Sequence, residues 1–321
     1  MRVLFLYSNE KLASTRIRIL NLIPYLSKKS IACTAIRYKE FEIKDAANYD
    51  MLVIQKKMVS MLDYWKLKKL KIPIVFDFDD AIFSRDKEKN GSYVSRSRQT
   101  KFNQTKKLAD AFICGNKYLA SFCPDGTNIV VAPSPVPHEL AQKNYSRANQ
   151  PIRIGWVGSA STLPMLERID SELNDLQRSH PFELHIIADR NYAAKNSKLQ
   201  IVNHRWEAET QEAIIAEFDI GIMPLQESPW TLGKCSYKLL QYMAASIPAL
   251  GSNIGMNQEI IQHNKNGILV DDGDWAKALS ELIMDPNKRK MLGTAGRKTI
   301  LENHTYDVYT QKWYALIQKL L

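Results

Sequence analysis

The stretch from Asp219 to Asn253 constrains the fold of this chain more than any other. Residues 219–225 form a short apolar run containing a proline, which is typical of a buried strand that ends in a loop. Apolar residues at 239, 240, 243 and 244 then follow helical spacing after Ser236, which can cap the helix, and residues 246–250 form a second apolar run. A strand, a helix and a strand in this order predict two parallel strands and an α/β fold.

The loop between the first strand and the helix contains Gly233 and Lys234. A glycine, a cation and the unpaired amides of a helix start, all at the carboxyl end of a parallel strand, suit an anion such as phosphate. The alternative is that these residues only finish a surface loop. Lys234 is therefore a candidate phosphate ligand.

Length and composition indicate a globular protein of two domains. A chain of 321 residues exceeds the usual size of one core, and 45% hydrophobic and 24% charged residues are typical of soluble proteins. The apolar opening Met1–Tyr7 is too short for a signal peptide, and no run is long enough to span a membrane. The four cysteines show no metal-binding spacing, which favours a reduced cytoplasm. Prolines at 133, 135 and 137 and the polar stretch to Gln150 predict the linker between the domains.

Positive charge is concentrated in the first half of the chain. The first 147 residues carry 26 Lys and Arg against 14 Asp and Glu, and the remainder carries 18 against 20. A basic half can face nucleic acid, an anionic membrane surface or a phosphorylated substrate, and a solvated lysine-rich surface is the alternative. The absence of a base-reading motif argues against nucleic acid.

Two stretches of the first half carry cations in informative positions. Ser14 and Thr15 can cap a helix whose first turn holds Arg16 and Arg18. Because the start of a helix is the positive end of its dipole, these cations are expected to pair with either a substrate anion or acidic side chains in ordinary salt bridges. Farther on, Trp65 stands among lysines 66, 68, 69 and 71, which is compatible with a membrane-surface edge or with a core tryptophan beside a solvated lysine face. Residues 84–104 are polar and are expected to be mobile.

A strand ending in Asp77, Asp79 and Asp80 places carboxylates where they can chelate a hard cation or orient hydroxyl groups. The pattern also resembles the first motif of the haloacid dehalogenase-like phosphatases, which would make Asp77 the nucleophile and Asp79 the acid/base. Ala81 departs from that motif, in which a threonine is expected. In the second half, the strand Ile152–Val157 and the turn Gly158–Thr162 precede a helix and again suit phosphate.

Together these segments resemble glycosyltransferases of the GT-B fold, close to family 4, the retaining nucleotide-sugar enzymes. The resemblance covers nearly the whole chain and rests mainly on Ala109–Ile113, Ile154–Ser159, Asp219–Leu225 and Lys238–Ala249. It implies two Rossmann-like domains facing a cleft. The acceptor-side domain comprises residues 1–148 plus a final helix at 304–321 that crosses back to it, and the donor-binding domain comprises residues 149–303.

The resemblance also implies functional residues. Asp79 and Lys234 are the candidate catalytic residues, and Lys234 would neutralise the leaving diphosphate. The candidate donor-binding residues are Gly158, Ser159, Ser161, Arg190, Cys235, Ser236, Tyr237, Lys238 and Gln241. The candidate acceptor-side residues are Ser14, Arg16, Arg18 and Asp80. No metal or other cofactor is expected, because the nucleotide sugar is itself the substrate.

The chain departs from the family pattern at three places. Gly233 and Gln241 occupy the positions of two glutamates, the arginine/lysine pair after the first glycine turn is missing, and Asp79 stands where a catalytic histidine is common. These departures leave open a binding module that has lost catalysis, besides the phosphatase alternative. The expected partners are a nucleotide sugar, a glycan or lipid-linked acceptor and an anionic membrane surface, at a cytoplasmic location.

Overall fold

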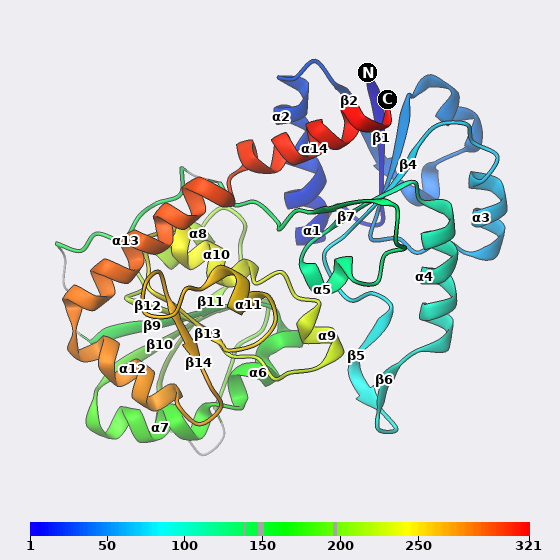
Figure 1. Ribbon diagram of the computed structural model, residues 1–321. Helices are drawn as coiled ribbons and strands as arrows, with labels where there is room; N and C mark the ends of the chain where they lie inside the picture. The colour runs from blue at the N-terminus through cyan, green and yellow to red at the C-terminus, as the bar shows by residue number, and fades with distance from the viewer. Residues whose placement is uncertain (138, 147–150, 195–197) are drawn as a thin grey trace. The chain divides into compact units, whose positions relative to one another are not determined.

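The computed structural model describes residues 1–137, 139–146, 151–194 and 198–321, and it divides into two compact units (Figure 1). Unit 1 comprises Met1–Pro135, Ser228–Cys235 and His304–Leu321, and unit 2 comprises Val136–Glu227 and Ser236–Asn303. The domain boundary expected at residue 148 lies outside the described residues, and the division falls earlier, after Pro135. Residues 228–235, which the sequence placed in the donor-binding domain, belong to unit 1.

Unit 1 is built on a six-stranded parallel sheet in the order β2-β1-β3-β4-β7-β8. Its central strands are almost wholly apolar, as parallel strands buried on both faces must be. The strands are β1 Arg2–Tyr7, β2 Ala32–Arg37, β3 Met51–Gln55, β4 Ile74–Phe78, β7 Ala111–Cys114 and β8 Asn128–Val131, with the antiparallel pair β5 Ser84–Lys89 and β6 Ser92–Val94. The helices are α1 Ala13–Thr15, a π-helix at Arg16–Leu20, α2 Ile23–Ser27, 3₁₀ turns at Tyr38–Glu40 and Ile43–Asn48, α3 Met61–Leu67, α4 Arg96–Leu108, α5 Lys117–Ala120, α9 Pro229–Leu232 and α14 Tyr306–Leu320.

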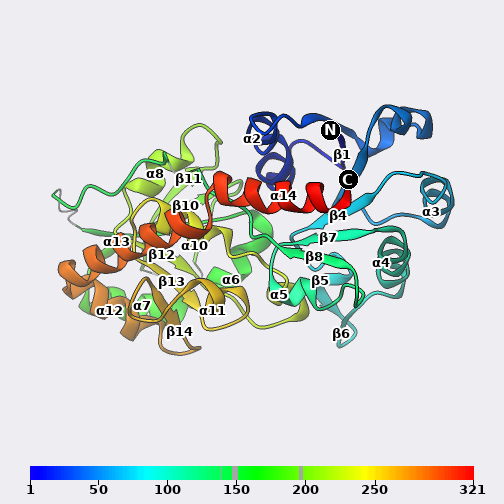
Figure 2. The same ribbon diagram turned by 45° about the horizontal axis from the view of Figure 1, so that its top comes forward.

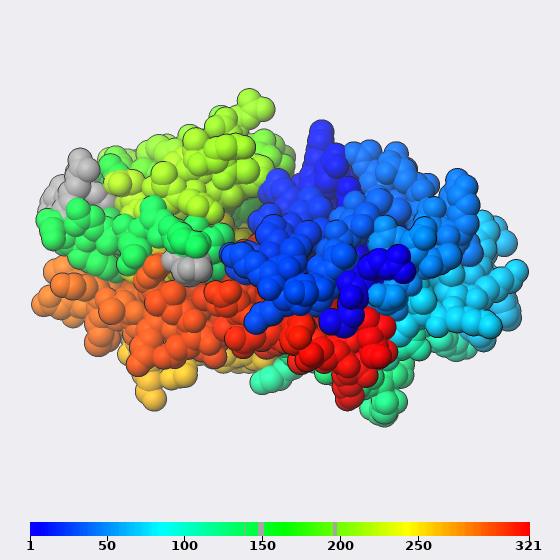
Figure 3. Space-filling view, turned by 90° about the horizontal axis from the view of Figure 1, so that it is seen from above, coloured from blue at the N-terminus to red at the C-terminus, as the bar shows by residue number. Residues whose placement is uncertain are grey.

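The last helix, α14, completes the core of unit 1. Thr305 caps it by accepting a hydrogen bond from Val308 N. Trp313 is fully buried, and its ring centroid lies 5.5 Å from that of Phe5 in β1. In the space-filling view the C-terminal residues lie against N-terminal ones (Figure 3). The end of the chain therefore packs on the domain that its beginning forms.

Unit 2 is a second six-stranded parallel sheet, in the order β11-β10-β9-β12-β13-β14. Its strands are β9 Ile152–Val157, β10 Phe182–Ala188, β11 Gln200–Arg205, β12 Ile220–Met223, β13 Ala249–Ser252 and β14 Ile268–Val270. Its helices are a 3₁₀ turn at Ala160–Thr162, α6 Leu163–Glu167, α7 Asp170–Ser179, α8 Gln211–Ala216, α10 Tyr237–Ala244, α11 Met256–Ile260, α12 Trp275–Met284 and α13 Pro286–Asn303. The α/β class expected from the sequence is confirmed.

The strand, helix and strand predicted between residues 219 and 253 are β12, α10 and β13. The two strands are parallel neighbours, with Gly221 opposite Ala249, so the prediction is confirmed. The predicted cap is wrong: Ser236 precedes α10 in a left-handed conformation (φ 50°), and its hydroxyl donates to Asn257 Oδ1 at 2.6 Å instead of accepting from the helix. The side chain of Ser236 therefore does not cap α10.

Two local expectations in unit 1 are also wrong. Residues 84–104 contain β5, β6 and most of α4, and α4 is held in place by burying Phe102, Thr105 and Leu108. The first helix is not capped by Ser14 or Thr15, because it begins at Ala13 and widens into the π-helix; the Thr15 hydroxyl instead donates to Gln55 Oε1 at 3.0 Å.

Candidate functional site

Two lysines and two aspartates of unit 1 lie together, and we call Lys56, Asp79, Asp80 and Lys234 the lysine–aspartate cluster. Lys56 follows β3 and the aspartates follow β4, so neighbouring parallel strands deliver them to one edge of the sheet. Lys56 Nζ lies 3.2 Å from Asp79 Oδ1 and hydrogen-bonds Asp80 Oδ2. Lys234 Nζ donates to Asp80 Oδ1 at 3.0 Å. Asp80 thus bridges both ammonium groups.

The cluster is partly shielded from solvent, with side chains between 13% and 25% exposed. Burial alone would lower the pKa of Lys56, but the charges of Asp79 and Asp80 raise it above its ordinary value. Burial alone would likewise raise the pKa of Asp80, but Lys234 and Lys56 hold it below its ordinary value. Asp80 is therefore ionised, and Lys56 protonated, at neutral pH. Asp79 Oδ1 accepts no well-aligned hydrogen bond despite its proximity to Lys56.

The segment around Lys234 is fixed to the rest of unit 1 by close contacts. Asn116 donates from Nδ2 to Leu232 O at 3.0 Å and to Lys234 O at 2.9 Å. A Cβ on Gly233 would lie 2.6 Å from Ala81 Cβ and 2.7 Å from its backbone nitrogen, so no side chain fits there. The position that carries a glutamate in the glycosyltransferase resemblance is thus closed by packing.

Lys234 has its charge satisfied within unit 1. Besides the bond to Asp80, its Nζ lies 3.8 Å from the ring centroid of Trp230, which is a close cation–π contact. The neighbouring Cys235 thiol donates to Asp79 O at 3.1 Å, and burial raises the pKa of that thiol. Lys234 and Cys235 therefore belong with the carboxylates of unit 1.

In unit 2 the glycine turn, Gly158–Thr162, follows β9, but most of its amides already have partners. Gly158 N donates to Ile187 O at 2.9 Å, and Ser159 N donates to Thr162 Oγ1 at 3.3 Å. Ala160 N donates to Asp189 Oδ1 at 2.6 Å. The backbone amides of the turn that the sequence predicted to suit phosphate are thus largely occupied. The carboxylate of Asp189 accepts from one of them, as a phosphate would.

The cation beside the glycine turn is Lys238. Its Nζ lies 3.4 Å from Thr162 Oγ1 and 4.2 Å from the ring centroid of Trp156. A Cβ on Gly158 would lie 2.9 Å from this Nζ and 2.4 Å from the Trp156 ring, so the glycine is needed for the approach. Lys238 comes from the first turn of α10, which the side chain of Ser236 does not cap. This arrangement can bind an anionic group at the carboxyl end of β9.

Residues 152–285 match the family model described as "Glycosyl transferases group 1". The whole chain superposes on sucrose-phosphate synthase from Thermosynechococcus elongatus, with a TM-score of 0.78, 11% identity and coverage of 99% and 98% of the two chains. The chain also superposes on HepE from Anabaena in complex with UDP and glucose, with a TM-score of 0.75, 14% identity and coverage of 100% of both chains.

The chain has the GT-B fold. Its resemblance to group 1 glycosyltransferases is confirmed over residues 152–285. A GDP-mannose-dependent alpha-(1-6)-phosphatidylinositol monomannoside mannosyltransferase from Mycobacterium tuberculosis is 33% identical over 76 residues, 23% of this chain and 20% of that protein. The human alpha-1,3/1,6-mannosyltransferase ALG2 is 29% identical over 84 residues, 26% and 20% of the two chains. The matched stretches thus span about a fifth of the length of these relatives.

Of the acceptor-side residues predicted for this GT-B protein, only Asp80 lies in the cluster. Arg18 is fully buried, and its Nε lies 3.1 Å from both carboxylate oxygens of Asp77. Its assignment to substrate binding is corrected accordingly: it is a core ion pair, and attraction to Asp77 raises its pKa although burial opposes this. Ser14 in α1 and Arg16, the first residue of the π-helix, are both partly exposed.

The same burial removes the nucleophile of the phosphatase alternative. Asp77 has no exposed surface and is neutralised by Arg18, so it cannot attack a substrate phosphate. No group of three or more His, Cys, Asp or Glu side chains within the described residues is arranged to hold a metal ion.

The remaining donor-side candidates lie in unit 2. Arg190 is exposed at the carboxyl end of β10, next to Asp189, which contacts the glycine turn. Ser159 and Ser161 share a hydrogen bond between their hydroxyl groups at 2.8 Å. The candidates in and before α10 are Ser236, Tyr237, Lys238 and the buried Gln241.

Lys56 is the functional candidate that the sequence did not reveal. It adopts a left-handed conformation (φ 58°), and its amide donates to Asp77 O at 2.7 Å. A non-glycine residue in that conformation is strained, and such strain is concentrated at functional sites. The available signal was its position directly after the apolar strand Met51–Gln55, at the sheet edge that carries the aspartates.

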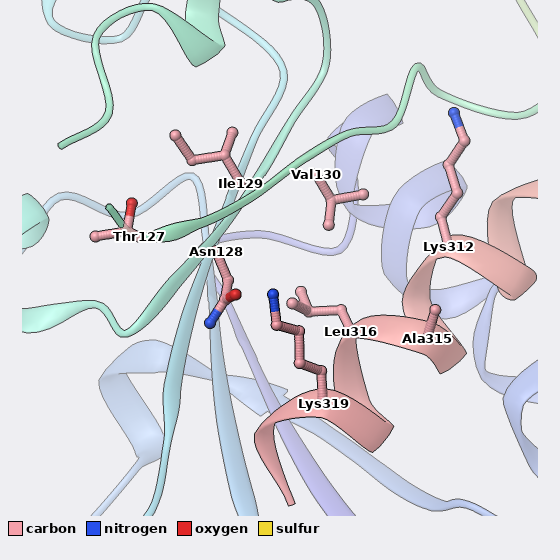
Figure 4. A pocket seen from close by; sticks show the side chains of 8 residues that line it. All are labelled: Thr127, Asn128, Ile129, Val130, Lys312, Ala315, Leu316 and Lys319. Carbon is pink, nitrogen blue, oxygen red and sulfur yellow. The ribbon is translucent and has the colours of Figure 1, made fainter. Parts of the chain in front are cut away.

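A separate cavity of about 450 Å³ lies beside the edge strand β8 (Figure 4). Its lining residues are Thr127, Asn128, Ile129, Val130, Lys312, Ala315, Leu316 and Lys319. Lys312 donates to Val131 O at 3.0 Å, and burial lowers its pKa. The cavity shares no residue with the lysine–aspartate cluster or the glycine turn.

Proposed function

We propose that this GT-B protein is a glycosyltransferase that moves a sugar from a nucleoside-diphosphate sugar to an acceptor. The acceptor would be a cell-surface glycan, a lipid-linked saccharide or another glycoconjugate in polysaccharide biosynthesis, and the reaction would occur in the cytoplasm. The family match over residues 152–285 supports this proposal, as do mannosyltransferase relatives and the UDP and glucose bound to HepE.

The observation that carries the proposal is the position of Lys238 at the glycine turn. A nucleoside-diphosphate sugar presents two negatively charged phosphates, and Lys238 offers an ammonium group beside a hydroxyl, in the first turn of a helix. In this proposal Lys238 replaces Lys234 as the residue that stabilises the leaving diphosphate, because Lys234 is bound to Asp80 and lies over Trp230. The exposed Arg190 is a second cation for the same group.

The lysine–aspartate cluster supplies the acceptor-side chemistry in this proposal. Asp79 keeps 13% of its side chain exposed, so its carboxylate can accept a hydrogen bond from a sugar hydroxyl and act as a general base. Lys56 Nζ lies 3.2 Å from the Asp79 carboxylate, so it holds this carboxylate in place and balances its negative charge. We propose retention of anomeric configuration, with attack from the face that the leaving group vacates, which requires no carboxylate nucleophile. We also propose that no metal ion is required.

A non-catalytic binding module is the second candidate function. It is favoured by the closed position at Gly233, where packing against Ala81 leaves no room for a carboxylate, and by the amide of Gln241 at the other glutamate position. Such a module would bind the nucleotide sugar without breaking it.

The test combines ligand binding with turnover in three variants. Binding of nucleoside diphosphates and their sugars is measured by thermal shift and calorimetry, and hydrolysis or transfer by release of the diphosphate in the presence of EDTA. We expect Lys238→Ala to weaken diphosphate binding about ten- to a hundredfold, the value of a charge-assisted hydrogen bond. The control Lys277→Ala removes an exposed lysine from α12 and should change nothing.

The outcomes separate the alternatives. If Lys238→Ala bound diphosphate with unchanged affinity, the assigned diphosphate site would be refuted. If Lys234→Ala instead lost the ten- to hundredfold in affinity expected for Lys238→Ala, Lys234 would be the residue that binds the diphosphate. Asp79→Asn should retain donor binding but lose transfer. Wild-type protein that binds a nucleotide sugar, yet neither hydrolyses nor transfers it with any acceptor offered, would support the binding module.

A further inference from the structure

Helix α3 of unit 1 exposes three large apolar side chains on one face. Met61 is 53% exposed, Leu62 is 75% exposed and Trp65 is 58% exposed. At 100° per residue these three positions fall within one sector of the helix, so they form a single apolar surface. The interpretation of Trp65 as a core residue is therefore wrong.

Lysines surround this apolar surface. Between residues 57 and 71 the chain carries five lysines, all exposed, and one acidic residue, Asp63. Lys66 lies in the last turn of α3, and Lys68 and Lys69 follow in the turn that ends the helix, close to Trp65 along the chain. Lys68 Nζ lies 5.6 Å from the ring of Trp65. We call Met61, Leu62, Trp65 and these five lysines (57, 66, 68, 69 and 71) the α3 surface.

The α3 surface is presented by a well-anchored helix. The Ser60 side chain caps α3 by accepting from Asp63 N at 3.1 Å, and Leu67 on the opposite face is 2% exposed. Just before the cap, Val59 N donates to Thr105 Oγ1 of α4 at 2.9 Å. Helices α3 and α4 lie side by side in both views (Figures 1 and 2). The apolar side chains are thus held outward by a fixed scaffold.

We propose that the α3 surface docks on an anionic lipid bilayer. An exposed tryptophan and aliphatic side chains flanked by lysines are the features of a segment that lies in the membrane interface, where the apolar groups enter the headgroup region and the ammonium groups meet lipid phosphates. Trp65 suits this position because its ring is apolar and its N–H is polar.

The charge of the α3 surface argues against a second copy of the chain, or another protein, as its partner. A second copy of the chain in a two-fold arrangement would bring the same five lysines against one another, which is repulsive. Lysine is also depleted in protein–protein interfaces relative to other surface. The lipid proposal does not depend on the sugar-transfer activity, because it rests on exposure and charge alone. No helix in the described part of the chain has the length and apolar character to cross a bilayer.

The test uses the full chain and two vesicle compositions, phosphatidylcholine alone and phosphatidylcholine with about 30 mol% phosphatidylglycerol. Binding is measured by vesicle sedimentation at low and physiological salt. We expect binding to the anionic vesicles only, weaker at higher salt. Lys66→Gln/Lys69→Gln should lower the partition coefficient about 25-fold, or about fivefold for each charge. The matched control Lys290→Gln/Lys298→Gln removes the same net charge from α13 and should retain binding.

The apolar part is tested by Leu62→Ala/Trp65→Ala, which should lower the partition coefficient at least tenfold. All of these side chains are exposed, and an unchanged melting temperature verifies that each variant folds. In wild-type protein, tryptophan emission should shift to shorter wavelength with anionic vesicles, and Trp65→Phe should remove most of that shift. The proposal is overturned by absence of vesicle binding, by equal losses in the α13 control, or by a dimer that Leu62→Ala/Trp65→Ala dissociates.

Discussion

Replacing Arg18 by methionine leaves the carboxylate of Asp77 buried in unit 1 without its partner. Both side chains are fully buried in the native protein. Arg18 also donates from Nη1 to Ala132 O at 2.9 Å and to Ser134 Oγ at 3.3 Å, so the substitution deprives three groups of a donor. A buried charge that loses its partner cannot recover its hydration, so breaking a buried pair is strongly destabilising.

We expect Arg18→Met to lower the free energy of unfolding of unit 1 by about 3–5 kcal/mol. At roughly 2–4 °C per kcal/mol for a domain of this size, the melting temperature should fall on the order of 10 °C. The double variant Arg18→Met/Asp77→Leu should recover most of this loss, because no buried charge remains and apolar packing replaces the pair. Arg18→Lys should be nearly as destabilised as Arg18→Met, since an ammonium group cannot bridge both carboxylate oxygens.

Differential scanning calorimetry of the four proteins measures these changes, with urea unfolding followed by circular dichroism as an independent check. The matched control is Arg178→Met, which breaks an ion pair with Asp175 whose side chains are 80% and 65% exposed. That pair should contribute less than about 1 kcal/mol. If Arg18→Met were no more destabilising than Arg178→Met, or if the double variant were less stable than Arg18→Met, the assignment of Arg18 to the core would be refuted.

Three further perturbations test other contacts. Gly115→Ala should lower the free energy of unfolding by about 1–3 kcal/mol and displace Cys235, because the new Cβ would lie 2.1 Å from the Cys235 Sγ. A thermal melting curve measures this loss of stability. Burial lowers the pKa of His304 from 6.5 to about 4, so its protonation opposes folding and stability should fall by about 2 kcal/mol between pH 7.5 and pH 5. His304→Gln should lack that component of the pH dependence in urea titrations at both pH values. Tyr145→Phe should cost about 1–2 kcal/mol in the same titration, since its hydroxyl donates to Ser246 O at 2.6 Å.

Much of the fold could be predicted because its signals are local. The apolar runs and helical spacing around residues 219–253 identified β12, α10 and β13, and their parallel pairing follows from the order strand, helix, strand. Asp79 and Asp80 were recognised as site residues because they follow an apolar strand directly. Lys56 follows a strand equally directly but was missed, because only the register of β3 against β4 brings it to the aspartates.

The two α/β halves, and the edge of each sheet at which polar groups gather, could be predicted from the amino-acid order, because hydrophobic periodicity and strand ends are local features of the chain. The pairing of charges depends on the folded chain. Arg18 and Asp77 are 59 positions apart and Lys234 and Asp80 are 154 apart, and no local pattern shows that these contacts neutralise them. Ionic partners are chosen by distance in space and by burial, so Lys238, the cation beside the glycine turn, could be distinguished from Lys234 only after the chain had folded.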